Sequence, residues 1–169
     1  MISTTTIIVY NNDEGGISIV HPVVSEINPA TGTHFTIEEI AQKVVVESAG
    51  ISTYSIIDDA VCPNDRTFRN SWSAVGIGTT AVVTEDMTKA KEIHKTNIRN
   101  TRTPLLAALD VEFQKAQETS AGITTIVAKK QVLRDAPAAS GISTAANTTE
   151  LQAQWDTSIL GTSPYPTSS

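Results

Sequence analysis

The residues of this chain that could do chemistry are one cysteine, Cys62, and three histidines, His21, His34 and His94. A nucleophilic cysteine needs a base and an orienting group, and no such arrangement accompanies Cys62-Pro63. The histidines are far apart, and none has Cys, Asp or Glu at metal-ligand spacing with a second ligand pair. We therefore predict no catalytic residue, no metal and no cofactor. We expect His94 to lie at the surface or at a packing edge.

Residues 75–80 (VGIGTT) contain a Gly-x-Gly pattern. A nucleotide cradle also needs a phosphate-binding Lys and a strand–loop–helix context, which are both missing. We interpret this stretch as a flexible loop. A small hydrolase or nucleotide-binding enzyme is the competing class, and a pocket with strongly shifted pKa values would favour it.

Four basic residues fall on one face of a predicted long helix: Lys91, Lys95, Arg99 and Arg102. They could form a docking strip for an acidic partner. They could equally form a solvated helix face, because like charges four residues apart cost only a few tenths of a kcal/mol. The sequence leaves both interpretations open.

A second cluster holds Arg66, Phe68, Arg69 and Trp72, preceded by Asp65. Arg and Trp dominate interface hot spots, so these residues could bind a partner. In the alternative, which we favour, an Arg–Asp pair fixes a turn while Phe68 and Trp72 are buried.

Composition narrows the possible functions. The 169 residues carry a net charge of −6, with a sequence pI near 5.0, which disfavours nucleic-acid binding. A single cysteine cannot form an internal disulfide. The sequence has no apolar run of about 20 residues and no signal-peptide pattern, so we predict synthesis and folding in a cytoplasm, without membrane contact.

The stretch from Thr84 to Arg134 has the clearest helical periodicity and positions the cationic face. Thr84-Glu85-Asp86 is typical of a helix start. Pro104 predicts a kink or break, and Gly122 predicts a left-handed helix end. A second helix over 123–134 would complete an antiparallel αα-hairpin.

The N-terminal part predicts a small α+β arrangement. A hairpin is expected from strands over 5–10 and 17–20, since β-branched runs flank a turn-rich segment. A capping box, Thr36 with Glu39, predicts a helix to about Ser48. Further elements are expected as follows: strands over 54–58 and 81–83, and one helical turn over 66–70.

The C-terminal part predicts less structure. We expect a loop over 135–147, a helix from a capping box at 149–152 to about Trp155, and a flexible tail over 161–169. The resulting fold class is α+β. Its parts are an N-terminal α+β part (1–83), a helical hairpin part (84–160) and the tail (161–169).

Several stretches together resemble a family of small proteins encoded among the tail genes of tailed bacteriophages. They span about residues 60–156: Asp65–Trp72, Asp86–His94, Pro104–Phe113, Lys130–Asp135, and Thr149–Leu151 followed by Trp155. The Leu-Arg-Asp element at 133–135 is similar to the C-terminal part of tail-fibre assembly proteins.

The resemblance implies a virion structural protein of a phage tail, at the baseplate or the fibre attachment region. Its partners would be other tail or fibre proteins and further copies of itself, as a homo-oligomer, after synthesis in the bacterial cytoplasm. The alternatives are a tail-fibre assembly chaperone and a capsid decoration protein. The N-terminal hairpin or the tail would engage neighbouring chains, for example by edge-strand addition.

Overall fold

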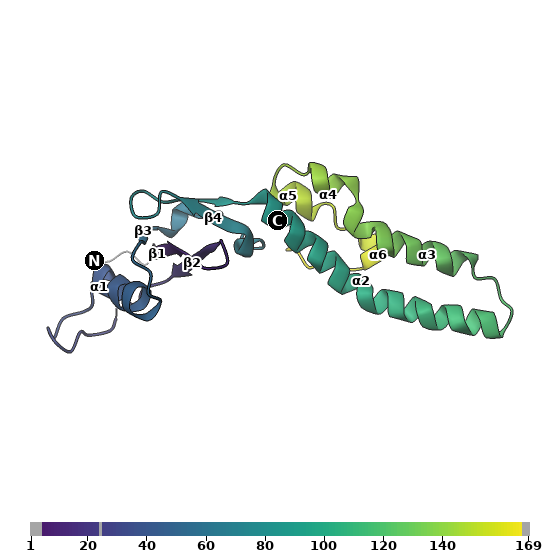
Figure 1. Ribbon diagram of the computed structural model, residues 1–169, viewed down its shortest axis with the longest axis horizontal. Helices are drawn as coiled ribbons and strands as arrows, with labels where there is room; N and C mark the ends of the chain where they lie inside the picture. Colours follow the sequence, from purple (N-terminus) through teal and green to yellow (C-terminus); the bar gives the residue numbers. More distant parts are fainter. Residues whose placement is uncertain (1–4, 24, 167–169) are drawn as a thin grey trace. The chain divides into compact units, whose positions relative to one another are not determined.

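The computed structural model describes residues 5–23 and 25–166, so residues 167–169 of the predicted tail lie outside it. The chain divides into two compact units after Asp86, close to the boundary expected after Val83. Helices and small antiparallel sheets occur together, which confirms the α+β class. Each unit is described by itself (Figure 1).

The N-terminal unit is built on a three-stranded antiparallel sheet. Its strands are β1 (Thr6–Asn11), β2 (Ile17–Val20) and β3 (Ser55–Asp58), in the order β2-β1-β3. The predicted β1–β2 hairpin is confirmed, with Ile8 opposite Val20 and Asn11 opposite Ile17. The side-chain oxygen of Asn12 accepts hydrogen bonds from the N–H groups of Glu14 and Gly16, at 3.2 and 2.9 Å, which fixes the turn.

The central strand β1 separates two hydrophobic cores because successive side chains point to opposite faces. On one face, Ile8 packs against the helix α1 (Ile37–Ala41) and its π-helical continuation η1 (Gln42–Ser48). The predicted capping box of Thr36 and Glu39 is present at the start of α1. On the other face, Ile7 and Val9 pack against residues that include Trp72 and Val83.

The layer on that second face is a two-stranded hairpin of β4 (Trp72–Val75) and β5 (Val82–Glu85). We did not predict β4, and the helical turn expected over 66–70 is present only as the 3₁₀ turn η3 (Arg69–Ser71). A further 3₁₀ turn, η2 (Asp59–Val61), precedes Cys62. The helix predicted to start at Thr84-Glu85-Asp86 begins directly after this triplet, at Met87, because Thr84 and Glu85 still belong to β5. Alternation along the strand overrides the local capping pattern there.

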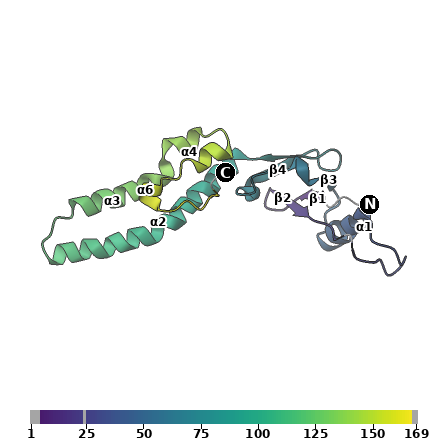
Figure 2. The same ribbon diagram turned by 180° about the vertical axis from the view of Figure 1, so that it is seen from behind.

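The helical unit contains the predicted αα-hairpin. The long helix α2 (Met87–Glu118) and α3 (Thr124–Asp135) lie side by side in both views (Figures 1 and 2). Contrary to the possible break, α2 continues through Pro104, although it changes direction near its middle in both figures. Proline removes one helical hydrogen bond, which accounts for a bend without a break.

The link between α2 and α3 does not use the predicted glycine. Ser120, with φ 53°, takes the left-handed conformation, and Gly122 does not. The Ala121 N–H donates to the carbonyl of Ala116 at 2.8 Å, a pattern that closes a helix end.

The chain after α3 is more ordered than expected. The predicted loop contains η4 (Ala136–Ala138) and α4 (Ser140–Thr144), in which Ile142 is buried. Next come α5 (Thr148–Gln152) and α6 (Thr157–Leu160). Asn147, and not Thr149, caps α5 by accepting from the Glu150 N–H.

The beginning of the predicted flexible tail is anchored to α2. Tyr165 is buried, and its hydroxyl lies 2.6 Å from Nδ1 of His94. The side-chain amide of Asn97 donates to the same hydroxyl at 3.4 Å. An aromatic side chain with a satisfied polar end compensates for the entropy lost in ordering this segment.

Candidate functional site

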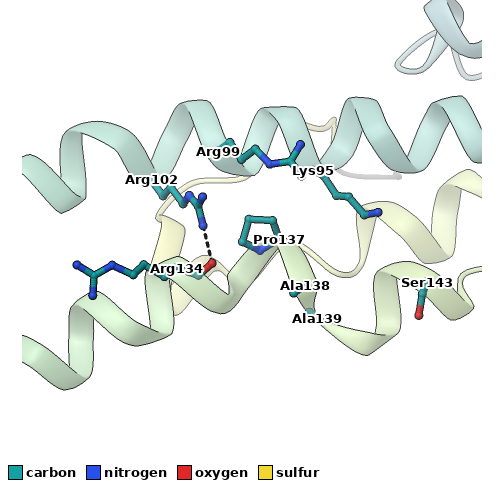
Figure 3. Close-up of a pocket in the computed structure, with 8 residues that line it drawn as sticks. All are labelled: Lys95, Arg99, Arg102, Arg134, Pro137, Ala138, Ala139 and Ser143. Carbon is teal, nitrogen blue, oxygen red and sulfur yellow. Dashed lines mark hydrogen bonds between the residues drawn. The ribbon is translucent and has the colours of Figure 1, made fainter.

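The cationic face of α2 forms one wall of a pocket in the helical unit. Lys95, Arg99 and Arg102 contribute from α2, and Arg134 contributes from the end of α3 (Figure 3). The pocket has a volume of about 410 Å³ and is completed by Pro137, Ala138, Ala139 and Ser143. No Asp or Glu is among these lining residues, so the pocket has the chemistry of an anion-binding site.

The helical period brings the α2 side chains together. Positions 95, 99 and 102 are separated by four and three residues, which places them on one helix face. In Figure 3, Lys95 and Arg99 lie on the α2 side, with Pro137 opposite, and the guanidinium of Arg134 points away from Pro137. The pocket is therefore open to a ligand between α2 and the segment that follows α3.

The side chain of Arg102 connects the two helices of the αα-hairpin. Its Nη1 donates to the backbone carbonyls of Leu133 and Arg134, at 3.1 and 2.5 Å. In a regular helix the carbonyl of Leu133 would accept from the N–H of residue 137, which here is a proline without an N–H. Arg102 supplies the missing donor and also places a cation at a helix C-terminus.

The other predicted cations have different roles. Lys91 donates to the carbonyl of Ser143 at 2.7 Å, which attaches α4 to α2, and it does not line the pocket. Lys95 pairs with Glu92 at 2.8 Å, and this hydrogen bond lowers the pKa of the Glu92 carboxyl. Within the described residues, the guanidinium of Arg99 makes no hydrogen bond, so it is the cation most available to a ligand.

Arg134 was not among the predicted site residues. It lies 32 positions after Arg102, so no local spacing joins it to the α2 face. The available signal was indirect: the antiparallel hairpin itself brings the C-terminal end of α3 back beside the first half of α2.

The cluster at 66–72 follows its internal interpretation. Phe68 and Trp72 are only 1% and 2% exposed, so in this structure they are not available to a partner. Arg66 forms an ion pair with Asp59 at 2.6 Å, while the carboxylate of Asp65 accepts from the Thr67 N–H at 2.9 Å. The predicted Arg–Asp pair is present, but with a different aspartate.

The exposed member of the cluster is Arg69, which lies in η3. It belongs to the N-terminal unit, whereas the cationic face of α2 belongs to the helical unit. Of the eight predicted partner-binding residues, Phe68 and Trp72 are buried and so contribute to no surface.

The cysteine and the histidines considered for catalysis or metal binding do not form a site. Cys62 is buried in the sheet core, and burial raises the pKa of its thiol. His21 and His34 are exposed. In the described part of the chain, no group of three His, Cys, Asp or Glu residues could hold a metal ion.

His94 corrects our expectation of a surface position, because it is completely buried. Its ring stacks on Tyr165 at 5.4 Å and meets the edge of Trp155 at 6.2 Å. Burial lowers its pKa to about 4, and Nε2 has no hydrogen-bond partner. His94 is a neutral core residue that anchors the C-terminal segment.

Comparison with known proteins gives no family assignment: no family model, no curated protein and no solved structure matches this chain. Among the described residues, no helix combines the length and the apolar character needed to cross a bilayer.

Proposed function

We propose that this chain is a structural protein of a bacteriophage tail, at the baseplate or fibre attachment region, that acts by protein–protein packing. The resemblance of residues 60–156 to tail-gene proteins suggests the context. The observation that supports packing is in the outer half of the αα-hairpin, which is the part of α2 beyond Pro104 together with α3. The rest of the chain covers this half incompletely.

That half buries few residues and exposes several large apolar ones. Leu109 and Ala116 are the buried residues of α2 beyond Pro104, and Leu133 is the buried residue of α3, among the residues described. Four apolar side chains remain between 36% and 50% exposed: Leu105, Val111, Val127 and Val132. Two helices with so small a shared core gain stability when a further surface covers them.

Part of this surface is shaped as a groove. It lies between α2, α3 and α6, has a volume of about 500 Å³, and is lined mainly by apolar side chains that include Leu105, Val132 and Ile159. A helix or an extended segment of a neighbouring tail protein would fit such a groove. A role without catalysis agrees with the burial of Cys62 and His94.

The test is mass spectrometry of purified particles of the phage that encodes the chain, with copy-number determination. A fixed multiple of three or six copies per particle supports the structural role. Absence from particles, combined with a requirement for infectious ones, would instead identify an assembly chaperone.

A variant sharpens this test. Leu105→Glu with Val132→Glu places two charges in the groove without changing a buried residue, so the fold should persist. We expect the copy number per particle to fall at least tenfold. The matched control is Val75→Glu, an exposed position of the other unit, and equal incorporation of both variants would refute a role for the groove.

A further inference from the structure

The two units of the chain carry different charge balances. Residues 1–86 hold three Lys or Arg and eleven Asp or Glu, whereas residues 87–169 hold nine and seven. The basic pocket concentrates four of those nine cations. Such a distribution favours attraction between the acidic unit of one copy and the basic pocket of another.

Most of the adjacent acidic pairs in the N-terminal unit already have internal partners. Glu39 accepts from the N–H of Thr36, and Asp59 binds Arg66. Asp58 caps η2. Glu85 and Asp86 both make interactions within the chain.

The remaining pair is Asp13-Glu14, in the turn between β1 and β2. Both residues are exposed, and within the described residues neither carboxylate makes a hydrogen bond or an ion pair. The bonds from Glu14 and Gly16 to Asn12 hold the turn in one conformation. A preformed turn loses little entropy on binding, which favours association.

The pocket offers matching groups. Arg99 is exposed and makes no side-chain hydrogen bond among the described residues, and Lys95 pairs only with the exposed Glu92. Arg102 is held by two carbonyls, so its positive charge stays fixed at the pocket wall. A volume of about 410 Å³ accommodates two neighbouring carboxylate side chains.

We propose that the basic pocket of one copy receives the acidic turn Asp13-Glu14 of a second copy, whose carboxylates are bound by Arg99 and Lys95. Each copy has one pocket and one turn, so the contact either closes as a reciprocal dimer or larger ring or continues as a filament. This contact would give the packing role proposed above a partner, a second copy of the chain. It can be tested independently of the tail role, because the purified chain should self-associate outside any particle.

The experiment uses two double variants of the full chain, studied by sedimentation velocity over a range of concentrations. Lys95→Gln with Arg99→Gln disables the pocket, and Asp13→Asn with Glu14→Gln disables the turn; the variants are neutral, so the altered pocket cannot bind the altered turn. The unmodified chain should form oligomers that grow with concentration and weaken as salt is added. Each double variant alone should be monomeric, with Kd raised at least tenfold.

An equimolar mixture of the two variants is the decisive sample. The first variant keeps a working turn and the second keeps a working pocket, so the mixture should form one-to-one dimers and nothing larger. Lys115→Glu and Glu47→Lys are the controls, because both residues are exposed and lie outside the pocket and the turn. These controls should oligomerise like the unmodified chain.

Three results would overturn the proposal: an unmodified chain that stays monomeric, oligomers that survive both double variants, or a mixture without dimers. Circular dichroism of each variant verifies that it is folded. The copy number in particles is a separate measurement, so failure here leaves the proposed tail role to be judged on its own.

Discussion

The first and second halves of helix α2 have the same secondary structure but different surroundings. The first half buries Ala90, His94 and Ile98, four residues apart, beneath a cover that includes Trp155 and Tyr165. The second half buries Leu109 and Ala116, seven residues apart, and packs mainly against α3. A buried residue on each successive turn is typical of a helix in a globular core, and buried residues two turns apart are typical of a small two-helix seam. One helix therefore provides both a folded anchor and an exposed surface.

The largest expected effect comes from opening the core at the first half. Leu151→Ala removes a completely buried side chain of α5 and should lower the free energy of unfolding by about 3 kcal/mol. Val111→Ala, at a residue of the second half that is 50% exposed, should change it by less than about 0.5 kcal/mol. Urea denaturation followed by far-UV circular dichroism measures both, and similar losses would erase the contrast between the halves.

Lowering the pH should destabilise the first half of α2 more than the second half. The pKa of His94 is about 4 in the folded chain and about 6.5 when unfolded, so the unfolded state binds more protons between these pH values. Stability is therefore retained above pH 6.5 and lost as the pH falls toward 4. We expect a loss of about 2 kcal/mol, less than the full shift would give because solvent relaxation screens the buried charge.

The measurement is hydrogen exchange of the α2 amides as a function of pH, corrected for intrinsic rates. Protection around His94 should fall between pH 6.5 and 4, with a smaller change around Leu109. His94→Gln is the control, because it should remove this pH dependence relative to the unmodified chain. A pH profile that is unchanged in the variant would show that other groups cause it.

Arg102 lies near the junction of the two halves and should have an intermediate effect. Arg102→Gln leaves the Leu133 carbonyl without the donor that Pro137 cannot supply, and we expect a loss of about 1 to 2 kcal/mol in thermal unfolding. Arg99→Gln is the matched control, since Arg99 makes no hydrogen bond among the described residues. Equal Tm values for the two variants would mean that Arg102 does not stabilise the hairpin.

The sequence predicted those elements whose signals are local. The β1–β2 hairpin, the Thr36–Glu39 box and the two long helices all follow from turn chemistry, capping and periodicity within a few residues. The basic face was also predicted, because helical spacing alone determines it. Features that depend on distant partners were not predicted: β4 pairs with a later strand, and Tyr165 orders its segment by packing on His94.

In the candidate site too, the role of a single residue depends on distant partners that the sequence does not reveal. Lys91, Lys95, Arg99 and Arg102 look equivalent in the sequence, yet the structure gives two of them structural roles through carbonyls more than 30 positions away. Charge and spacing identify the face, and only the return of α3 and α4 shows which cations remain available to a ligand.

The smallest expected effect tests how the second half ends. Ser120 takes the left-handed conformation at a cost of roughly 1 kcal/mol, which glycine would not incur. Ser120→Gly should therefore raise the stability of the hairpin by up to about 1 kcal/mol. Gly122 is not left-handed, and a Cβ there meets nothing within 4 Å, so Gly122→Ala should be neutral or slightly stabilising. If instead Gly122→Ala destabilised the hairpin in thermal unfolding while Ser120→Gly had no effect, the helix would end at the glycine, as the sequence pattern alone predicts. The seam between α2 and α3 would then be longer than described, and the contrast between the halves would be smaller.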